Sequence, residues 1–138
     1  MAARPLTADS SVVIPSLILW HPLHNAAAAA VKSVRRLPAH ALLESFAVLN
    51  RLPAPRAIPP RVAERLLAHS FPDQPLALGP EGYQTLVHKL AEADLGGGLI
   101  YDAVIAATAA ENGFRILTAD RRAVPIYALM GADFELVS

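Results

Sequence analysis

Four acidic residues of this 138-residue chain lie in apolar or small-residue segments, and the need to accommodate them restricts how the chain can fold. They are Asp9, Glu44, Asp102 and Asp120. Burying an ionised carboxylate without a partner is strongly unfavourable. A shared cation would offset that cost, and hard divalent ions such as Mg²⁺ or Mn²⁺ prefer oxygen ligands. If the four acids converge in the fold, they predict a metal-dependent active site.

Each acid also has an ordinary structural explanation when it is taken alone. Asp9 is a preferred N-cap for a following helix, and Asp102 in a first helical turn favours the helix dipole. Asp120 precedes Arg121-Arg122 and would form a turn or a surface ion pair, while Glu44 would be a solvated helix position. The metal-site prediction therefore depends on the four acids occurring together.

The apolar content of the chain indicates packed helices. The hydrophobic fraction is 54%, above the roughly 45–50% of soluble domains, and much of the excess is alanine. No apolar run approaches the roughly 20 residues of a membrane-spanning helix. The length is sufficient for one hydrophobic core, so we expect residues 1–138 to form a single domain.

The N-terminus and the absence of cysteine predict a cytoplasmic location. No long apolar stretch follows Arg4 and Pro5, because Asp9 interrupts the segment. The N-terminus is therefore a poor signal peptide. Without cysteine the chain forms neither disulfides nor thiolate metal sites.

The charged residues balance, with twelve basic and twelve acidic side chains, so net charge alone does not predict nucleic-acid binding. Ten of the twelve basic residues are arginine, and several cluster: Arg35-Arg36, Arg51 with Arg56 and Arg61, and Arg121-Arg122. Arginine suits bidentate contact with phosphates and stacking on bases. The alternative is that these arginines are ordinary surface residues in contact with water.

Short apolar segments alternate with helical segments along the chain. Strands are expected over 6–14, 115–118 and 134–137, with a short strand over 76–78 and a connector or strand over 36–40. Helices are expected after Pro15, which suits a first helical turn, and over 22–34, 41–50, 60–69, 80–94, 100–112 and 123–130. The alternation predicts an α/β fold around a mainly parallel sheet.

This fold would gather the acids at one edge, because sites in open parallel sheets form at the carboxyl ends of the strands. Asp9 lies near the end of the first strand and Asp120 directly follows the strand over 115–118. Asp102 lies in the first turn of its helix and Glu44 near the start of another. The sequence therefore predicts that the four side chains approach one another.

Other polar residues near the acids allow two interpretations. Ser10 and Ser11 would bond Asp9 or a bound phosphate, or satisfy local backbone groups. Thr118 would orient Asp120 or simply fill a strand position. The histidines nearest these segments share no metal-ligand spacing and predict no zinc site: His21, His24 and His40.

Four motifs follow one another along almost the whole chain. They are Asp9-Ser10-Ser11, Glu44 in a helix ending Val48-Leu49-Asn50-Arg51-Leu52-Pro53, Tyr101-Asp102-Ala103 followed by Ile105-Ala106-Ala107, and Leu117-Thr118-Ala119-Asp120. Together they resemble a PIN-domain ribonuclease, and more narrowly a VapC-type toxin of a bacterial type II toxin–antitoxin pair. The resemblance implies a PIN-like three-layer sandwich, in which helices flank a mainly parallel central sheet.

The resemblance also implies an activity and a set of partners. It implies an endoribonuclease that uses Mg²⁺ or Mn²⁺ to activate water, with Asp9, Glu44, Asp102 and Asp120 as metal ligands. It further implies a homodimer and a VapB-like antitoxin, through which alone the protein would contact operator DNA, and no membrane association. Apolar positions on the helices over 60–69 and 80–94 are candidates for a groove that binds an antitoxin helix.

Three alternative functions remain open on the sequence. The chain would be a housekeeping PIN-domain RNA-processing nuclease without an antitoxin, or a catalytically silent PIN-fold binding module. The presence of all four acids argues against the silent module. An aspartate-dependent phosphatase or receiver-like protein usually needs a lysine partner, and neither Lys32 nor Lys89 lies in a matching motif.

Overall fold

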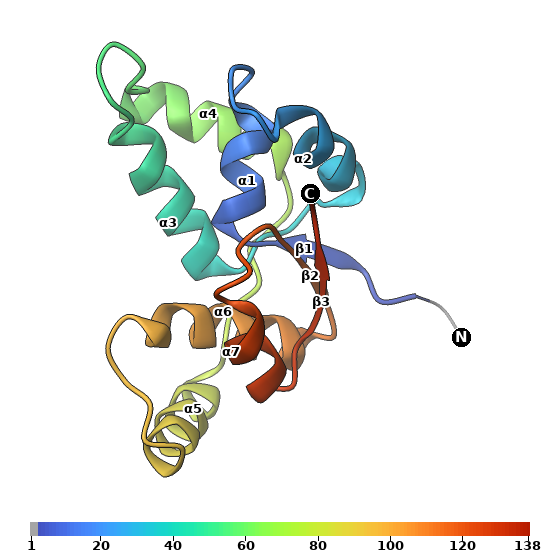
Figure 1. The fold of residues 1–138 in the computed structure, drawn as a ribbon, viewed down its shortest axis with the longest axis vertical. Coiled ribbons are helices and arrows are strands. Elements are labelled where there is room, and N and C mark those ends of the chain that lie inside the picture. The colour runs from blue at the N-terminus through green and yellow to red at the C-terminus, as the bar shows by residue number, and fades with distance from the viewer. Residues whose placement is uncertain (1–2) are drawn as a thin grey trace.

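A computed structural model describes residues 3–138 of the chain (Figure 1). Three parallel strands form one sheet in the order β1-β2-β3: β1 (Leu6–Ala8), β2 (Arg115–Thr118) and β3 (Asp133–Leu136). The helices are α1 (Ser10–Leu17), α2 (His24–Ala30), α3 (Ala39–Asn50), α4 (Pro60–Ser70), α5 (Pro80–Glu92), α6 (Leu99–Asn112) and α7 (Val124–Leu129), with a short 3-10 helix over Val31–Ser33.

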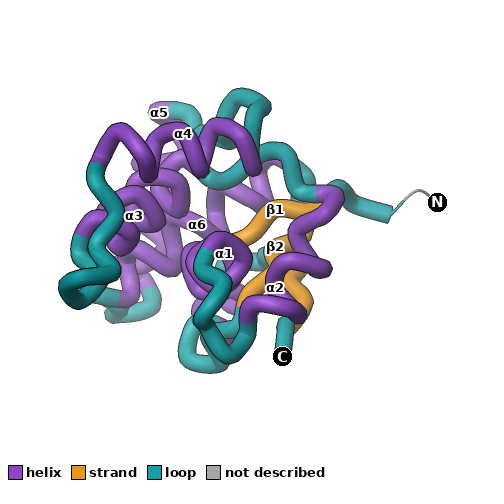
Figure 2. Tube along the Cα trace, turned by 90° about the horizontal axis from the view of Figure 1, so that it is seen from above, coloured by secondary structure: helices purple, strands orange, loops and turns teal. Residues whose placement is uncertain are grey.

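The helices cover both faces of the sheet, which gives the three layers that the sequence predicted. In Figure 1, α1 to α4 lie above the strands and α5 to α7 lie below them. Neighbouring residues of β2 point into opposite layers: Ile116 belongs to the core beside α6 and α7, and Leu117 to the core beside α1 and α4. Figure 2 shows the strands side by side, with α1 next to β1 and β2. The α/β sandwich with a parallel sheet is confirmed.

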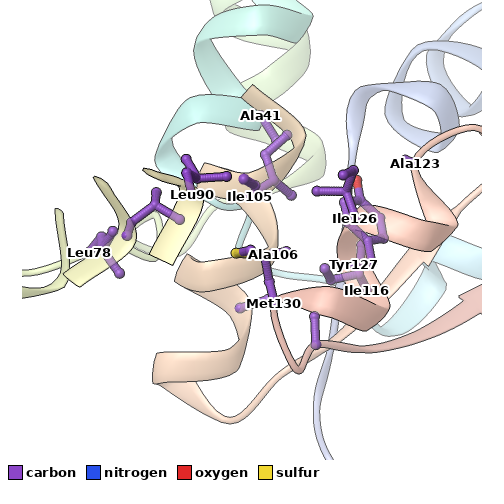
Figure 3. Close-up of a cluster of buried hydrophobic side chains, with 14 residues drawn as sticks. Ala41, Leu78, Leu90, Ile105, Ala106, Ile116, Ala123, Ile126, Tyr127 and Met130 are labelled. Carbon is purple, nitrogen blue, oxygen red and sulfur yellow. The ribbon is translucent and has the colours of Figure 1, made fainter. Parts of the chain in front are cut away.

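Helix α3 contacts both layers and so reaches across the end of the sheet. Ala41 near its start is buried in the core that contains Tyr127 and Ile116, part of which is drawn in Figure 3. Leu49 near its end is buried in the other core. Glu44 lies on the segment of α3 between these two anchors.

The first strand is much shorter than the sequence suggested. The predicted strand over 6–14 ends at Ala8, and the apolar residues Val12 and Val13 belong to α1 instead. The change of structure falls at Asp9, whose side chain accepts a hydrogen bond from the Ser11 backbone N–H and caps the helix. The expectation that Pro15 begins a following helix is also wrong, since Pro15 lies inside α1.

The predicted strand over 76–78 is reduced to one isolated bridge between Leu76 and Pro38. Two backbone hydrogen bonds support this bridge, from Leu76 to the Leu37 carbonyl and from Ala39 to the Leu76 carbonyl. Proline lacks a backbone N–H, so Pro38 cannot extend the ladder in the usual way. The segment over 36–40 is therefore mainly a connector.

Most of the remaining helices and strands begin and end within about two residues of the predicted positions, a normal uncertainty for such boundaries. The exception is the helix expected over 22–34, since α2 ends at Ala30 and the chain continues as the 3-10 helix Val31–Ser33. Pro60 and Pro80 each lie at the first turn of a helix, α4 and α5 respectively. Within residues 3–138, none of the helices combines the length and the apolar character that a bilayer-spanning segment needs.

Gly113 ends α6 in a left-handed backbone conformation with φ of 75°. No atom lies within 4 Å of the position that a Cβ would occupy there, so a Gly113→Ala change would meet only the conformational penalty. We expect a loss of about 1 kcal/mol in the free energy of unfolding, measured by urea denaturation.

Gly96 is the matched control, because its surroundings are equally open and its φ lies outside the left-handed region. A Gly96→Ala change should alter stability by less than about 0.5 kcal/mol. Equal effects of the two substitutions would contradict the conformational explanation for Gly113.

Candidate active site at the carboxyl ends of β1 and β2

Asp9 follows β1 directly and is almost completely buried, with 4% of its surface exposed. One carboxylate oxygen, Oδ1, accepts hydrogen bonds from the backbone N–H of Ser11, at 3.0 Å, and from the Ser11 hydroxyl. The other, Oδ2, accepts a hydrogen bond from the Tyr127 hydroxyl at 2.6 Å. Both oxygens of Asp9 are therefore held by donors from the protein.

The pKa of the Asp9 carboxyl lies above its usual value because burial disfavours the ionised form. The hydrogen bonds from Ser11, Thr118 and Tyr127 act in the opposite direction, since they stabilise the carboxylate. Burial has the larger effect. Asp9 is thus a desolvated acid whose negative charge depends on its hydrogen-bond donors.

Asp120 lies two residues after the end of β2 and is linked to the end of β1 through Ser11. The Ser11 hydroxyl oxygen accepts a hydrogen bond from the backbone N–H of Ala119 at 2.8 Å, while its own proton goes to Asp9. The Thr118 hydroxyl accepts the Asp120 backbone N–H at 3.1 Å, so Thr118 orients the backbone at Asp120. The carboxyl ends of β1 and β2 are tied together by these two hydroxyls.

Arg122 is the ion-pair partner of Asp120. Its Nε lies 3.3 Å from Asp120 Oδ1, and its backbone N–H donates to the same oxygen at 3.0 Å. The Arg122 side chain is 93% exposed. An exposed ion pair of this kind stabilises a protein by only about 1 kcal/mol or less, so Arg122 is held weakly and can exchange Asp120 for another anion.

Glu44 and Asp102 approach the same place from helices. The Ser10 hydroxyl donates to Glu44 Oε1, which joins α1 to α3. Asp102 lies in the first turn of α6 and is partly buried. Ser10 therefore bonds Glu44 and not Asp9, whereas Ser11 does bond Asp9, as expected.

The pKa of Asp102 responds to the charges of the other three acids. Burial raises the pKa of Asp102 most, followed by the negative charges of Asp120, Glu44 and Asp9, while Arg122 opposes them. The pKa of the Tyr127 hydroxyl is raised as well, by burial and by the charges of Asp9, Asp102 and Glu44. Like charges raise each other's pKa only over short distances. The geometry agrees, because Asp102 and Asp120 line one cavity and Asp120 lines a second one with Ser10 and Ser11, which bond Glu44 and Asp9. The four predicted site residues therefore form one cluster.

The cluster fits a hard divalent cation by the chemistry of its donors, because all four side chains offer carboxylate oxygens. Across the described residues 3–138, however, no three Asp, Glu or His side chains already stand in a coordination arrangement. The side chains would have to move together to enclose an ion. The donor set is present, and the coordination sphere is not preformed.

Two cavities open beside the cluster and share Asp120 and Arg122. One, of about 390 Å³, also reaches Asp102 and the glycine-rich start of α6. The other, of about 470 Å³, runs along α1 past Ser11 to His21. The cluster therefore borders open space on two sides.

The sequence reasoning missed Tyr127 altogether. Tyr127 lies in the short apolar helix α7, with no motif around it, and its only signal was a hydroxyl among apolar neighbours. It also missed that His40 and Tyr101 stack face to face, with ring centroids 5.1 Å apart, beside Glu44 and Asp102. The alternative roles of Asp9 as a helix cap and Asp120 as an ion-pair partner are both realised within the cluster.

Comparisons with known proteins agree with this fold and site. The sequence pattern of the PIN domain matches residues 7–128, and the chain therefore belongs to the PIN-domain family. Ribonuclease VapC40 of Mycobacterium tuberculosis is 39% identical over 130 residues, which cover 94% of this chain and 97% of VapC40. Ribonuclease VapC27 of the same species is 38% identical over 128 residues, covering 92% and 93%. Within the family, this chain is of the VapC type.

Solved structures share the fold at low sequence identity. The structure of FitAB bound to an IR36 DNA fragment has a TM-score of 0.69 at 15% identity and covers 95% of this chain and 94% of its own. Mycobacterium tuberculosis VapC20, a toxin that cleaves the sarcin–ricin loop, has a TM-score of 0.66 at 16% identity and covers 87% and 93%.

Proposed function

We propose that this chain is a divalent-metal-dependent endoribonuclease and the toxin of a VapBC-type pair. The observation that carries the proposal is the gathering of Asp9, Glu44, Asp102 and Asp120, which are linked through Ser10, Ser11 and the two cavities that share Asp120. The names of the relatives VapC40 and VapC27 as ribonucleases support the same activity. Residues 1–138 would act as one domain in the cytoplasm, where RNA is available.

The proposed chemistry follows from the sign of the charges. RNA carries a negative phosphodiester, which a cluster of four carboxylates repels. When bound by these acids, Mg²⁺ or Mn²⁺ would reverse the local charge, activate water and stabilise the leaving oxygen. Asp9, Glu44, Asp102 and Asp120 are the residues that would hold the ion, directly or through water.

The other residues of the site prepare these acids for binding. Ser11 and Tyr127 hold the two oxygens of Asp9, and Ser10 holds Glu44. The pKa of Asp102 is raised by burial and by the neighbouring acids, and a bound cation would favour its ionised form by offsetting their charges. Arg122 is the exposed cation of the site and would bind an RNA phosphate in exchange for Asp120.

An antitoxin is proposed as the partner that blocks this activity. The helices over 60–69 and 80–94, on which the sequence placed a candidate groove, are α4 and α5, and they lie on opposite sides of the sheet (Figure 1). A groove of about 430 Å³ lies instead between α3 and α4, lined largely by apolar side chains such as Leu43, Phe46 and Leu67. Such a groove suits the apolar face of a helix. Known FitAB and VapBC2 assemblies bound to DNA support an antitoxin that carries this chain to operator DNA, and the toxin would act as a homodimer.

Cleavage of total cellular RNA by the purified chain tests the proposed activity. We expect discrete fragments with Mg²⁺ or Mn²⁺ and none when EDTA removes the ion, because the acids alone repel the substrate. Sequencing the fragment ends would identify the cleavage sites. Fragments that persist in EDTA would exclude the metal-dependent mechanism. Folded, antitoxin-free protein that leaves all cellular RNA intact in either metal would instead support the silent binding module.

A further inference from the structure

The turn between α1 and α2 is closed by hydrogen bonds, yet it exposes apolar side chains. The His21 backbone N–H donates to the Ile18 carbonyl at 3.1 Å, and the Leu23 N–H donates to His21 Nδ1 at 3.0 Å. In this hydrogen-bonded turn, Leu19 is 82% exposed and Trp20 is 49% exposed. A large aromatic residue held in place at a surface is typical of a binding site.

Arg56, from the loop between α3 and α4, covers part of the Trp20 ring. The centre of its guanidinium lies 4.1 Å from the ring centroid, which is a close cation–π contact. Trp20 nevertheless keeps about half of its surface open to solvent. The pair therefore presents an aromatic ring and a planar cation side by side, and nucleic-acid bases stack on both of these groups.

The cavity of about 470 Å³ connects this turn with the carboxylate cluster. It begins at Asp120 and Arg122, follows one face of α1 past Ser11 and Pro15, and ends at His21, next to Trp20. Helix α1 has eight residues, so it spans roughly 12 Å. An extended strand whose phosphate lies at the cluster would therefore reach Trp20 with a base a short distance along the chain.

We propose that this groove holds single-stranded RNA beside the scissile phosphate, and that Trp20 stacks on an unpaired base next to Arg56. The inference rests on the proposed ribonuclease function and adds Trp20 as a residue that positions the RNA beside the cluster. Arg122 lines the groove beside the cluster, and Arg56 lies over Trp20 in the turn just beyond the other end, next to His21. These two cations favour a polyanion over an apolar partner. Stacking needs unpaired bases, so the groove selects single strands over duplexes.

Trp20 is the only tryptophan of the chain, so its fluorescence reports directly on the groove. The probes are an unstructured RNA oligonucleotide and the same sequence as a duplex, added with Mg²⁺ to the Asp102→Asn variant, which should leave the RNA intact while the ion offsets the charge of the remaining acids. We expect the single strand to quench the fluorescence and the duplex to do so much less. Absence of quenching by the single strand would overturn the proposal.

Substitution then measures the contribution of the ring. With a labelled oligonucleotide, Trp20→Ala should weaken RNA binding by roughly 5- to 100-fold, the range for loss of one base–aromatic stack, and Trp20→Phe should restore most of it. Tyr83 on α5 is also half exposed and lies outside the groove, so Tyr83→Ala should bind RNA normally. Unchanged affinity in Trp20→Ala would contradict the inference, and if that variant also lost self-association in sedimentation, the turn would be a protein interface instead.

The two levels of proposal can fail separately. If the protein cleaves RNA with metal but the Trp20→Ala variant binds RNA as well as the wild type, the ribonuclease proposal stands and the proposed role of Trp20 is wrong. If the protein binds single strands through Trp20 but cleaves no RNA with any metal, the RNA-binding proposal stands and the proposed catalytic function is wrong.

Discussion

Replacing Asp102 with asparagine should abolish RNA cleavage while leaving the fold intact. Asn keeps the size of the side chain but removes the charge, so the cluster loses one carboxylate ligand for the cation. Loss of groups that only orient metal ligands already reduces metal affinity or activity about 10- to 100-fold, so loss of a ligand should reduce cleavage by about 100-fold or more. Initial rates on a defined RNA, at saturating Mg²⁺ or Mn²⁺, measure the effect.

Glu111 provides the matched control for Asp102. It lies on the same helix, α6, and is exposed at the end far from the cluster, where its carboxylate accepts only a long hydrogen bond from the Gly79 N–H. Glu111→Gln removes the same charge and should cleave RNA at the wild-type rate. If Asp102→Asn retained the wild-type rate, the assignment of the cluster as the active site would be wrong.

The same Asp102 variant should be at least as stable as the wild type when metal is absent. The pKa of Asp102 is raised, so its ionised form destabilises the folded state above that pKa, and the penalty disappears as the pH falls through it. Asparagine removes the penalty at every pH. Thermal unfolding in EDTA near neutral pH should therefore give an equal or higher melting temperature, and a large decrease would contradict mutual repulsion among the acids.

Replacing Tyr127 with phenylalanine should destabilise the protein by about 1–3 kcal/mol at neutral pH. The substitution keeps the ring in the core but removes the hydroxyl that donates to Asp9 Oδ2. Asp9 is buried, so its carboxylate would lose part of the stabilisation that offsets burial. Urea denaturation measures the change in the free energy of unfolding.

The loss in Tyr127→Phe should depend on pH, and the sign follows from Asp9. The Tyr127 hydroxyl stabilises ionised Asp9, so without it the already raised pKa of Asp9 rises further. The penalty is complete above this pKa, where Asp9 is charged, and becomes smaller as the pH falls through it and the carboxyl is protonated. The difference between variant and wild type should therefore shrink on acidification.

Tyr83→Phe is the control for the tyrosine hydroxyl itself. Tyr83 is 50% exposed on α5, so its change should stay within about 0.5 kcal/mol at either pH. A Tyr127→Phe loss of the same size at neutral and acidic pH would assign the effect to core packing and not to the charge on Asp9.

Local sequence was sufficient to predict most of the helices, because their boundaries have local causes. Proline at a first turn begins α4 and α5, and the left-handed Gly113 ends α6. The acids that form the cluster were also recognisable, since each interrupts an apolar or small-residue segment within a motif. These features depend on residues only a few positions apart, so the local sequence is enough to predict them.

The change from β1 to α1 was not predictable in the same way. Val12, Val13 and Ile14 are β-branched residues that suit a buried strand as well as a buried helix. Asp9 was recognised as a potential cap, but capping adds only about 1 kcal/mol to a helix. Burial of Val12 and Val13 against the core beside Leu117 is what makes the helical alternative the stable one.

The sequence by itself determined which acids this protein carries and in what local contexts they stand. The tertiary structure alone decided how each acid is held. Tyr127 lies 118 positions after Asp9 in the sequence. It reaches Asp9 only because α7 packs beneath the sheet in which β1 and β2 are neighbours. The pKa of Asp102 likewise depends on charges from three other segments. Hydrogen bonding and charge repulsion act through space, so these properties arise only once the sheet brings distant segments together.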